Sequence, residues 1–306
     1  MIKNVGFIGA GVMGKSMIRN LMKKGFQVTV YSRTKSKAED IIAEGAIWRD
    51  SAAECAKGQD VIITIVGFPK DVEETYFGEK GIIANSEDNA ILIDMTTSSP
   101  KLAAKIYDEA KAASKHALDA PVSGGDSGAK AGTLSIMVGG DKDILEQAMP
   151  VFEAMGTNII YEGAAGCGQH TKMANQIALT GCIAGVCEAI TYARKTGLDI
   201  QTMLDSISAG AAGSWQMSNM APRMLKGDFD PGFFIKHYIK DMNIATEEGR
   251  EAGADLSISE AVLAIYKDLE AKGLGDLGTQ ALLKHYLDVQ RIIRMPNHCP
   301  IFLMMY

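Results

Sequence analysis

Three polar residues near the middle of the chain have the types and the spacing to act on a small polar molecule. Lys172, Asn175 and Gln176 stand at positions i, i+3 and i+4, so on a helix they share one face. An ammonium and two amides on one face could hold a polar substrate, and a lysine can also give or take a proton. The alternative is a solvated first turn of a helix. The elements predicted around these residues distinguish between the two interpretations.

The helix that carries this face is predicted to be long and to join two domains. Glycines at 166 and 168 can end the preceding unit, and a helical pattern runs from about 168 to 196. Its apolar stretch, Ile177 to Ile190, contains Thr180 and Glu188 and falls short of the roughly 20 residues that span a bilayer. We expect no membrane span. A helix this apolar is typical of one buried in protein, and it favours a homodimer or a homotetramer.

A glycine-rich turn near the N-terminus predicts a dinucleotide site. A short strand at 4–8 leads into the sequence GAGVMG at 9–14, which is followed by an amphipathic helix ending near Gly25 and a second strand at 26–31. This order of elements is the context that the GxGxxG fingerprint requires. The glycines allow a tight turn and close approach of a pyrophosphate to the helix N-terminus. The predicted cofactor contacts here are Gly9, Gly11, Val12, Met13 and Gly14.

The same letters also fit the phosphate loop of nucleotide triphosphatases. Gly9 to Ser16 matches GxxxxGK[ST], with Lys15 and Ser16 in the phosphate and magnesium positions. Asp94, at the end of an apolar stretch, could serve as the acidic strand end. We favour the dinucleotide interpretation because all three of its glycines are present and because of how the second strand ends.

The second strand ends in a basic loop. An acid at this position commonly binds the ribose of NAD, whereas an arginine suits the 2′-phosphate of NADP. The sequence has no acid there and offers Arg33, supported by Ser32, Thr34 and Lys37. It therefore favours NADP, with NAD possible. A solvated basic loop is the alternative.

Strands and helices alternate up to about residue 164, which predicts an α/β fold with a doubly wound, mostly parallel sheet of the Rossmann type. The predicted domains are 1–164, which binds NADP, and 165–306, which is all-helical. Ligands of such sheets lie beyond the carboxyl ends of the strands, so Val66, Gly67 and Thr97 are expected near the cofactor. Ser123, Gly124 and Gly125 could turn backbone N–H groups and a hydroxyl toward a carboxylate.

The composition excludes several classes of function. The 306 residues carry a net charge of −6, which gives no indication of nucleic acid as a partner. The five cysteines form no CxxC pair, and no ligand cluster suggests a metal. We expect a reducing compartment, the cytoplasm.

Five motifs, in order, resemble the β-hydroxyacid dehydrogenases, a family that includes 3-hydroxyisobutyrate dehydrogenase, tartronate semialdehyde reductase and the glyoxylate/succinic semialdehyde reductases. They are FIGAGVMGKSM at 7–17, DMTTSSP at 94–100, DAPVSGG at 119–125, GCGQHTKMANQ at 166–176 and KDMNIA at 240–245. The resemblance covers nearly the whole chain. It implies an NAD(P)-dependent enzyme that interconverts a small 3-hydroxy acid and its semialdehyde or oxo acid.

The resemblance also implies roles for single residues. Lys172 matches the catalytic lysine, which acts as general acid in reduction and general base in oxidation, and Asn175 matches an amide that positions the substrate. Ser123, Gly124 and Gly125 match the segment that binds the substrate carboxylate. Thr97 matches a residue near the nicotinamide, and Lys240 one that closes over the cofactor. For Asp241, next to Lys240, we expect a structural role.

Some alternatives stay open at this stage. A catalytically silent cofactor-binding protein of the same fold would show the same motifs. The choice among hydroxy acids and the physiological direction are not determined by the sequence. The ending from Arg294 also departs from the usual family terminus.

Overall fold

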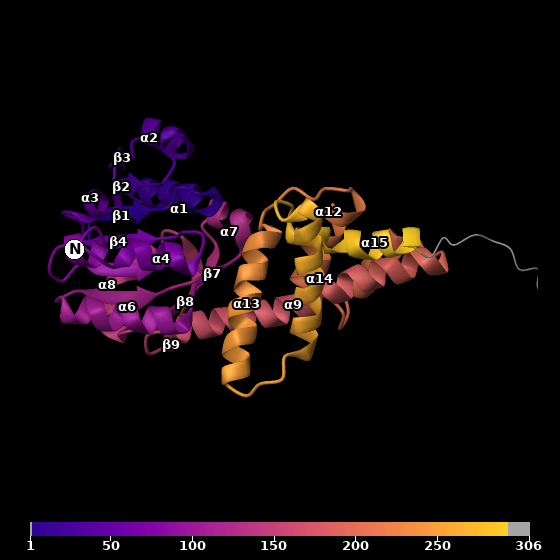
Figure 1. Cartoon of the computed structure of the whole chain (residues 1–306). Coiled ribbons are helices and arrows are strands. Elements are labelled where there is room, and N and C mark those ends of the chain that lie inside the picture. The colour runs from indigo at the N-terminus through magenta and orange to yellow at the C-terminus, as the bar shows by residue number, and fades with distance from the viewer. Residues whose placement is uncertain (1, 293–306) are drawn as a thin grey trace, which may run out of the picture. The chain divides into compact units, whose positions relative to one another are not determined.

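The computed structural model describes residues 2–292, which form two compact units (Figure 1). The first unit holds the chain up to Ala178 together with Lys236–Leu256, and the second holds Leu179–Ile235 and the described residues from Ser257 onward. The first part of the long helix packs with the first unit, so the packing units do not coincide with the predicted sequence domains 1–164 and 165–306. The ending from Arg294 lies outside the described residues.

The first unit is built on a nine-stranded sheet. Six strands are parallel and lie in the order β3-β2-β1-β4-β5-β6, the order expected of a Rossmann fold. Their bounds are β1 Asn4–Ile8, β2 Gln27–Tyr31, β3 Ile47–Trp48, β4 Val61–Thr64, β5 Ile91–Asp94 and β6 His116–Asp119. The α/β fold predicted from the alternating pattern is confirmed.

The last three strands extend this sheet with a change of direction. Strand β8 (Leu134–Gly140) runs antiparallel to β6, and it pairs with β7 (Val122–Ser123) and β9 (Gly156–Gly163). The β7 pairing is antiparallel and the β9 pairing is parallel.

Helices cover both faces of the sheet because each central strand is apolar on both sides. Val61, Ile63 and Ile93 belong to the core cluster on one face, whereas Ile62 and Leu92 belong to the cluster on the other. The first face is covered by α1 (Val12–Lys23), α2 (Glu39–Ala43), α7 (Gly125–Ala131) and α8 (Lys142–Phe152). The second is covered by α3 (Ala52–Ala56), α4 (Pro69–Tyr76), α5 (Ile82–Asn85) and α6 (Pro100–Ala112).

The register brings the carboxyl ends of the parallel strands into one row. Ile8 pairs with Thr64, Thr64 with Asp94, and Asp94 with Asp119. The turns that follow these residues therefore emerge at the same edge of the sheet, and we call it the carboxyl edge.

Local backbone geometry sets the bounds of two helices. Helix α6 ends at Ala112, because Ser114 turns the chain with a φ of 60° and β6 begins at His116. Helix α7 begins at Gly125, directly after β7 and Gly124.

The chain is helical beyond Gly166, as predicted. Helix α9 (Cys167–Thr196) is shared between the units, and α13 (Ile235–Glu251) lies almost wholly in the first. The second unit contains α10 (Ile200–Ser208), α11 (Trp215–Asn219), α12 (Ala221–Leu225), α14 (Ser257–Leu269) and α15 (Leu283–Ile292). Among the described helices, only α9 is long and apolar enough to cross a bilayer; core helices of soluble proteins satisfy the same criteria, and 44% of the apolar window is buried inside the protein.

Candidate functional site

The glycine turn after β1 has the shape that a dinucleotide requires. Gly9 has a φ of 114°, and a Cβ there would lie 2.1 Å from the carbonyl oxygen of Ile65. A Cβ at Gly14 would lie 1.9 Å from the carbonyl oxygen of Gly9. A Cβ at Gly11, in contrast, would meet nothing within 4 Å. Gly9 and Gly14 thus hold the turn closed against β4 and α1, while Gly11 leaves open space beside the N-terminus of α1, where a pyrophosphate fits.

The phosphate-loop alternative is not supported. The Lys15 ammonium lies 2.9 Å from Asp40 Oδ1 and is bound to this carboxylate on α2. Arg19 extends this surface cluster by pairing with Asp40 and Glu44. Asp94 is buried and accepts a hydrogen bond from Thr64 at 2.8 Å. Lys15 and Asp94 therefore make structural contacts within the first unit.

The basic loop after β2 is exposed, and its arginine already has an acidic neighbour. The side chain of Arg33 is 74% exposed, and its guanidinium lies 2.8 Å from Asp71 Oδ1 on α4. Ser32 and Thr34 belong to the same loop, and Lys37 lies in the 3-10 helix Lys35–Ala38 that follows it before α2. Arg33 would have to share its charge between Asp71 and an incoming 2′-phosphate.

The turns at the carboxyl edge are joined by a buried polar network. Val66 donates its backbone N–H to Thr96 Oγ1 at 3.0 Å, which ties the turn after β4 to the turn after β5. Below them, Thr64 Oγ1 contacts the Tyr76 hydroxyl at 3.1 Å and donates to Asp94. Burial raises the pKa of Asp94 to about 6, although the hydrogen bonds from Thr96 and Thr64 oppose this shift.

Lys172 lies in the second turn of α9, where its side chain is only 7% exposed. Burial lowers the pKa of its ammonium to about 8. The Asp241 carboxylate opposes this shift, and the Lys240 ammonium adds to it. This environment brings the pKa of Lys172 into the range in which a lysine can exchange protons near neutral pH.

A chain of contacts connects the Lys172 face of α9 to α13 and to the turn after β5. Asn175 Nδ2 donates to Gln176 Oε1 at 2.8 Å, and Gln176 Nε2 donates to Asp241 Oδ2 at 2.6 Å. The other oxygen of Asp241 lies 2.9 Å from Lys240 Nζ, in an ion pair whose geometry falls outside that of a hydrogen bond. Lys240 Nζ also donates to the carbonyl oxygen of Thr97. The structure thus brings Thr97, Lys240 and the polar face of α9 together.

Ser123, Gly124 and Gly125 follow the carboxyl end of β6 in the chain and lead from β7 into α7. Ser123 is half-buried in β7, opposite Ser135 of β8. Gly124 and Gly125 have φ angles of 129° and 64°, which glycine adopts without strain. A Cβ at Gly125 would meet nothing within 4 Å. The segment is therefore accessible on its Gly125 side, and its role in carboxylate binding stays a prediction.

Three residues near the site were not predicted from the sequence. Gln169 and Asp119 are buried. Asp119 accepts backbone N–H groups at the start of α9, and the Gln169 side chain binds the backbone of the turn after β5. The imidazole of His237, on α13, lies 5.4 Å from the Phe68 ring, in the turn after β4. Burial lowers the pKa of His237, and Lys240 and Lys236 add to that effect. The only sequence signal for His237 was its spacing of three from Lys240, which places both on one helix face.

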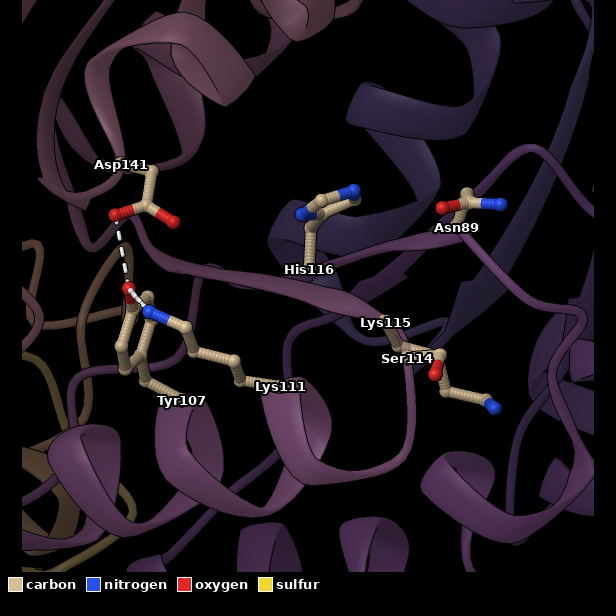
Figure 2. A pocket seen from close by; sticks show the side chains of 7 residues that line it. All are labelled: Asn89, Tyr107, Lys111, Ser114, Lys115, His116 and Asp141. Atoms are coloured by element: carbon tan, nitrogen blue, oxygen red, sulfur yellow. Dashed lines mark hydrogen bonds between the residues drawn. The ribbon is translucent and has the colours of Figure 1, made fainter.

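A pocket elsewhere on the first unit does not belong to this site. Its lining residues surround the amino ends of β5 and β6, at the edge opposite the glycine turn (Figure 2). Three of its polar groups are bound to one another (Figure 2): Tyr107 donates to Asp141 at 2.8 Å, and Lys111 donates to the Tyr107 hydroxyl at 3.2 Å. Among the described residues, no group of three or more His, Cys, Asp or Glu side chains could hold a metal.

Two family models cover most of the chain. The NAD-binding domain of 6-phosphogluconate dehydrogenase matches residues 4–163, and a domain described as the NAD-binding domain of NADP-dependent 3-hydroxyisobutyrate dehydrogenase matches residues 166–286. An uncharacterised oxidoreductase of Bacillus subtilis is 55% identical over 93% of this chain and 99% of its own length. The 2-hydroxy-3-oxopropionate reductase of Escherichia coli is 35% identical over 96% of this chain and 98% of its own length.

The chain belongs to the β-hydroxyacid dehydrogenase family. A solved structure of this kind, Mycobacterium tuberculosis 3-hydroxyisobutyrate dehydrogenase with L-serine, superposes with a TM-score of 0.84 at 32% identity and covers 93% of this chain and 99% of that one. The catalytically silent alternative loses support, because named relatives of this β-hydroxyacid dehydrogenase are dehydrogenases and reductases. Lys172 therefore belongs to an NAD(P)-linked oxidoreductase.

Proposed function

We propose that this β-hydroxyacid dehydrogenase reduces a small semialdehyde or 3-oxo acid to the 3-hydroxy acid with NADPH, and that Lys172 is the proton donor. The observation that carries the proposal is the environment of Lys172. The ammonium is buried, has a pKa of about 8, and is flanked by one carboxylate and one further ammonium. Such a perturbed group is suited to acid–base catalysis, whereas a purely structural role does not require it.

The protein's part in the reaction follows from this environment. A nicotinamide bound at this site would supply the hydride, and negative charge would then develop on the carbonyl oxygen of the substrate. The Lys172 ammonium stabilises that charge and delivers a proton to the oxygen. In the reverse direction the neutral amine takes the proton from the hydroxyl. Asn175, whose Nδ2 is bound to Gln176, orients the substrate from the next turn of α9.

The substrate class is inferred from the carboxyl-binding segment and from the relatives. Ser123, Gly124 and Gly125 offer a hydroxyl and an accessible backbone turn, which suit a carboxylate. The Escherichia coli relative is named for a three-carbon acid with a hydroxyl and an oxo group, and the Mycobacterium tuberculosis structure is described with L-serine. Both names fit a short acid with an oxygen-bearing carbon at position 3.

The NADP preference rests on the basic loop after β2. Ser32, Arg33, Thr34 and Lys37 supply two cations and two hydroxyls at the strand end that meets the adenosine ribose. The family description of residues 166–286 is that of an NADP-dependent enzyme. In Arg33→Ala, the affinity for NADPH should fall far more than the affinity for NADH. An equal fall in both would overturn the assignment of Arg33 to the 2′-phosphate.

The experiment follows the loss of NADPH or NADH absorbance with a panel of short semialdehyde acids, for the wild type, Lys172→Ala and Lys105→Ala. Lys105 carries the same charge but pairs with Glu73 on the surface. Lys172→Ala should keep its affinity for NADPH and lose turnover by about 100- to 10,000-fold. Lys105→Ala should match the wild type. Turnover of Lys172→Ala within a few-fold of the wild type would remove Lys172 from the mechanism.

Two further expectations belong to this proposal. The described cysteines, at 55, 167, 182 and 187, are free thiols, which fits the reducing cytoplasm. The partner is a small carboxylate-bearing molecule, and the site has no need of nucleic acid, a membrane or a metal.

A further inference from the structure

Gln169 makes a two-point contact with the backbone of the turn after β5. Its side chain is fully buried in the first turn of α9. Oε1 accepts the backbone N–H of Ser98 at 2.9 Å, and Nε2 donates to the backbone carbonyl of Thr96 at 2.7 Å. The two contacted peptide groups lie on either side of Thr97. The amide of Gln169 therefore fixes the position of Thr97 in the way that a neighbouring strand would.

The first turn of α9 is itself fixed to the sheet. Asp119, at the end of β6, accepts the backbone N–H of Gly166 at 2.7 Å and that of Gln169 at 2.8 Å. A carboxylate here satisfies two N–H groups of the helix N-terminus and faces the positive end of the helix dipole. A Cβ at Gly168 would lie 2.4 Å from the carbonyl oxygen of Met137. The helix start therefore has little room to shift against β6 and β8.

Lys172 follows Gln169 by three residues, so the two side chains leave the same face of α9 one turn apart. One short segment of helix thus holds the Thr97 backbone with one side chain and carries the catalytic ammonium on the other. On its far side, the Thr97 carbonyl accepts from Lys240. Two groups from outside the turn thus hold the backbone at Thr97, the Gln169 amide on α9 and the Lys240 ammonium on α13. Of the two, Gln169 lies on the same helix as Lys172.

We propose that Gln169 is a positioning residue for hydride transfer, which sets the distance between the turn at Thr97 and the Lys172 ammonium. This inference rests on the proposed function, in which Lys172 protonates the substrate, and on the family resemblance, which implies that Thr97 lies near the nicotinamide. Gln169 acts through the backbone of 96–98 and touches neither reactant. Misplacing that backbone slows the reaction because hydride and proton transfer both require close alignment.

The substitution Gln169→Glu provides a test that a purely structural role would not meet. A protonated carboxyl has the shape and the hydrogen-bond pattern of the amide, because its carbonyl oxygen accepts from Ser98 and its O–H donates to Thr96. The ionised form has only acceptors, and one oxygen would then face the Thr96 carbonyl. Burial favours the protonated form. Acidification should therefore restore the contact in Gln169→Glu but not in Gln169→Met.

Other titrating groups surround this position and have to be separated from the introduced carboxyl. Asp119 on β6 and Asp94 on β5 disfavour its ionisation, whereas Lys172 on α9 and Lys240 on α13 favour it. These groups are common to all variants. The ratio of variant to wild-type activity at each pH removes their own contributions to first order.

The experiment measures kcat, KM and the kinetic isotope effect with deuterated NADPH, between about pH 5.5 and 8.5, for the wild type, Gln169→Glu and Gln169→Met. We expect kcat of Gln169→Met to fall roughly 10- to 100-fold at every pH, with a larger isotope effect and a KM within a few-fold of the wild type. The kcat ratio of Gln169→Glu to wild type should rise at least several-fold as the pH falls. Parallel pH profiles for all three proteins, or a kcat of Gln169→Met within two-fold of the wild type, would overturn the proposal.

A second readout needs neither cofactor nor activity, so it separates this proposal from the proposed function. The Ser98 amide hydrogen, which is donated to Gln169, should exchange with solvent faster in Gln169→Met at pH values where global unfolding is negligible. In Gln169→Glu it should be protected at low pH only. Unchanged Ser98 exchange in both variants would refute the contact even if Lys172 proved catalytic. If Lys172→Ala stayed active while Ser98 exchange rose as expected, only the proposed chemistry would fail.

Asn85→Leu is the matched control. Its side-chain amide also bridges two nearby backbone groups, since Nδ2 donates to the carbonyl oxygens of Glu79 and Gly81 at 2.9 and 2.8 Å. It lies just before β5 begins, at the end of the sheet opposite the turn at Thr97. We expect its kcat, isotope effect and Ser98 exchange to match the wild type.

Discussion

Three effects set the pKa of the Lys172 ammonium, of which two lower it and one raises it. Burial and the Lys240 ammonium lower its pKa, and the Asp241 carboxylate raises it, with a net result of about 8. The acid in the reductive direction is the charged form, which predominates below this pH. We predict that kcat/KM for reduction is level below about pH 8 and falls above it, whereas kcat/KM for oxidation rises through the same range. Initial rates in both directions from pH 6 to 10 measure this. Profiles that bend in the same direction would contradict a shared acid–base group.

Asp241 opposes the two effects that lower the pKa of Lys172. It accepts from Gln176 and pairs with Lys240, and it is the neighbour that keeps Lys172 charged. In Asp241→Asn, Lys172 loses its carboxylate neighbour and still faces Lys240, so its pKa should fall further, by roughly one unit. The break in the reductive pH profile should move to lower pH with it. A break that stays in place would show that Asp241 has only the structural role expected from the sequence.

The sequence was informative about the residues that bear the chemistry and much less so about those that hold them. The i, i+3, i+4 spacing predicted that Lys172, Asn175 and Gln176 share a face, and the structure links the two amides to Asp241. Gln169 and Asp119 gave no such signal, because their partners are backbone groups distant in sequence. Lys15 suggested a phosphate loop, but its ammonium binds Asp40, a contact that a short sequence motif cannot predict. Arg33 was chosen for its charge, and its pairing with Asp71 depends on how α4 packs.

Among the elements, the start of α9 is the one most constrained by close packing. A Cβ at Gly168 would lie 2.4 Å from the Met137 carbonyl oxygen and 2.7 Å from that of Asp119. We predict that Gly168→Ala lowers the free energy of unfolding by about 1 to 3 kcal/mol and lowers kcat, because the first turn of α9 must move. Urea denaturation and initial rates measure the two effects.

Gly185→Ala, on the same helix, separates packing from helix propensity. A Cβ at Gly185 would meet nothing within 4 Å, so alanine there should be neutral or stabilise the protein by about 0.5 to 1 kcal/mol. Equal destabilisation by both substitutions would refute the close-packing argument for Gly168.

The elements that were predicted well are those with long, regular patterns. The buried strands β4 and β5 and the glycine turn after β1 carry strong local signals, and the parallel order of six strands followed from the alternation of strands and helices. The antiparallel turn of the sheet into β7 and β8 depends on pairing between distant segments and had no local signal. The end of α6 at Ala112 has no strong local signal, because the turn that follows depends on a positive φ at Ser114, which is uncommon for serine.

For the molecule as a whole, the Asp94 network makes folding stability depend on pH. Burial raises the pKa of Asp94 from about 3.8 to about 6. Since the folded state binds this proton more tightly than the unfolded state, the stabilisation is complete below about pH 4 and is lost as the pH rises through 6. Two pKa units correspond to about 3 kcal/mol.

Asp94→Asn removes this dependence and keeps an oxygen to accept from Thr64 and Thr96. We predict that the stability of the variant relative to the wild type increases by about 2 kcal/mol between pH 4.5 and 7.5. Urea denaturation at four pH values within this range measures the difference. If the two stability curves run parallel, Asp94 does not titrate in this interval.

At the same scale, the second unit exposes several large apolar side chains, which favours self-association. Tyr192 near the end of α9, Trp215 at the start of α11 and Ile258 at the start of α14 are 66, 51 and 71% exposed. Exposed apolar side chains of this size are common at contacts between subunits.

We predict a homodimer or a homotetramer that uses the exposed face of α9. Tyr192→Glu should shift it toward the monomer at micromolar concentration, whereas Lys105→Glu, on the first unit, should not. Size-exclusion chromatography with light scattering measures the mass of each protein. A wild type that is monomeric at these concentrations would refute the assembly, and an unchanged oligomer in Tyr192→Glu would move its interface away from this part of α9.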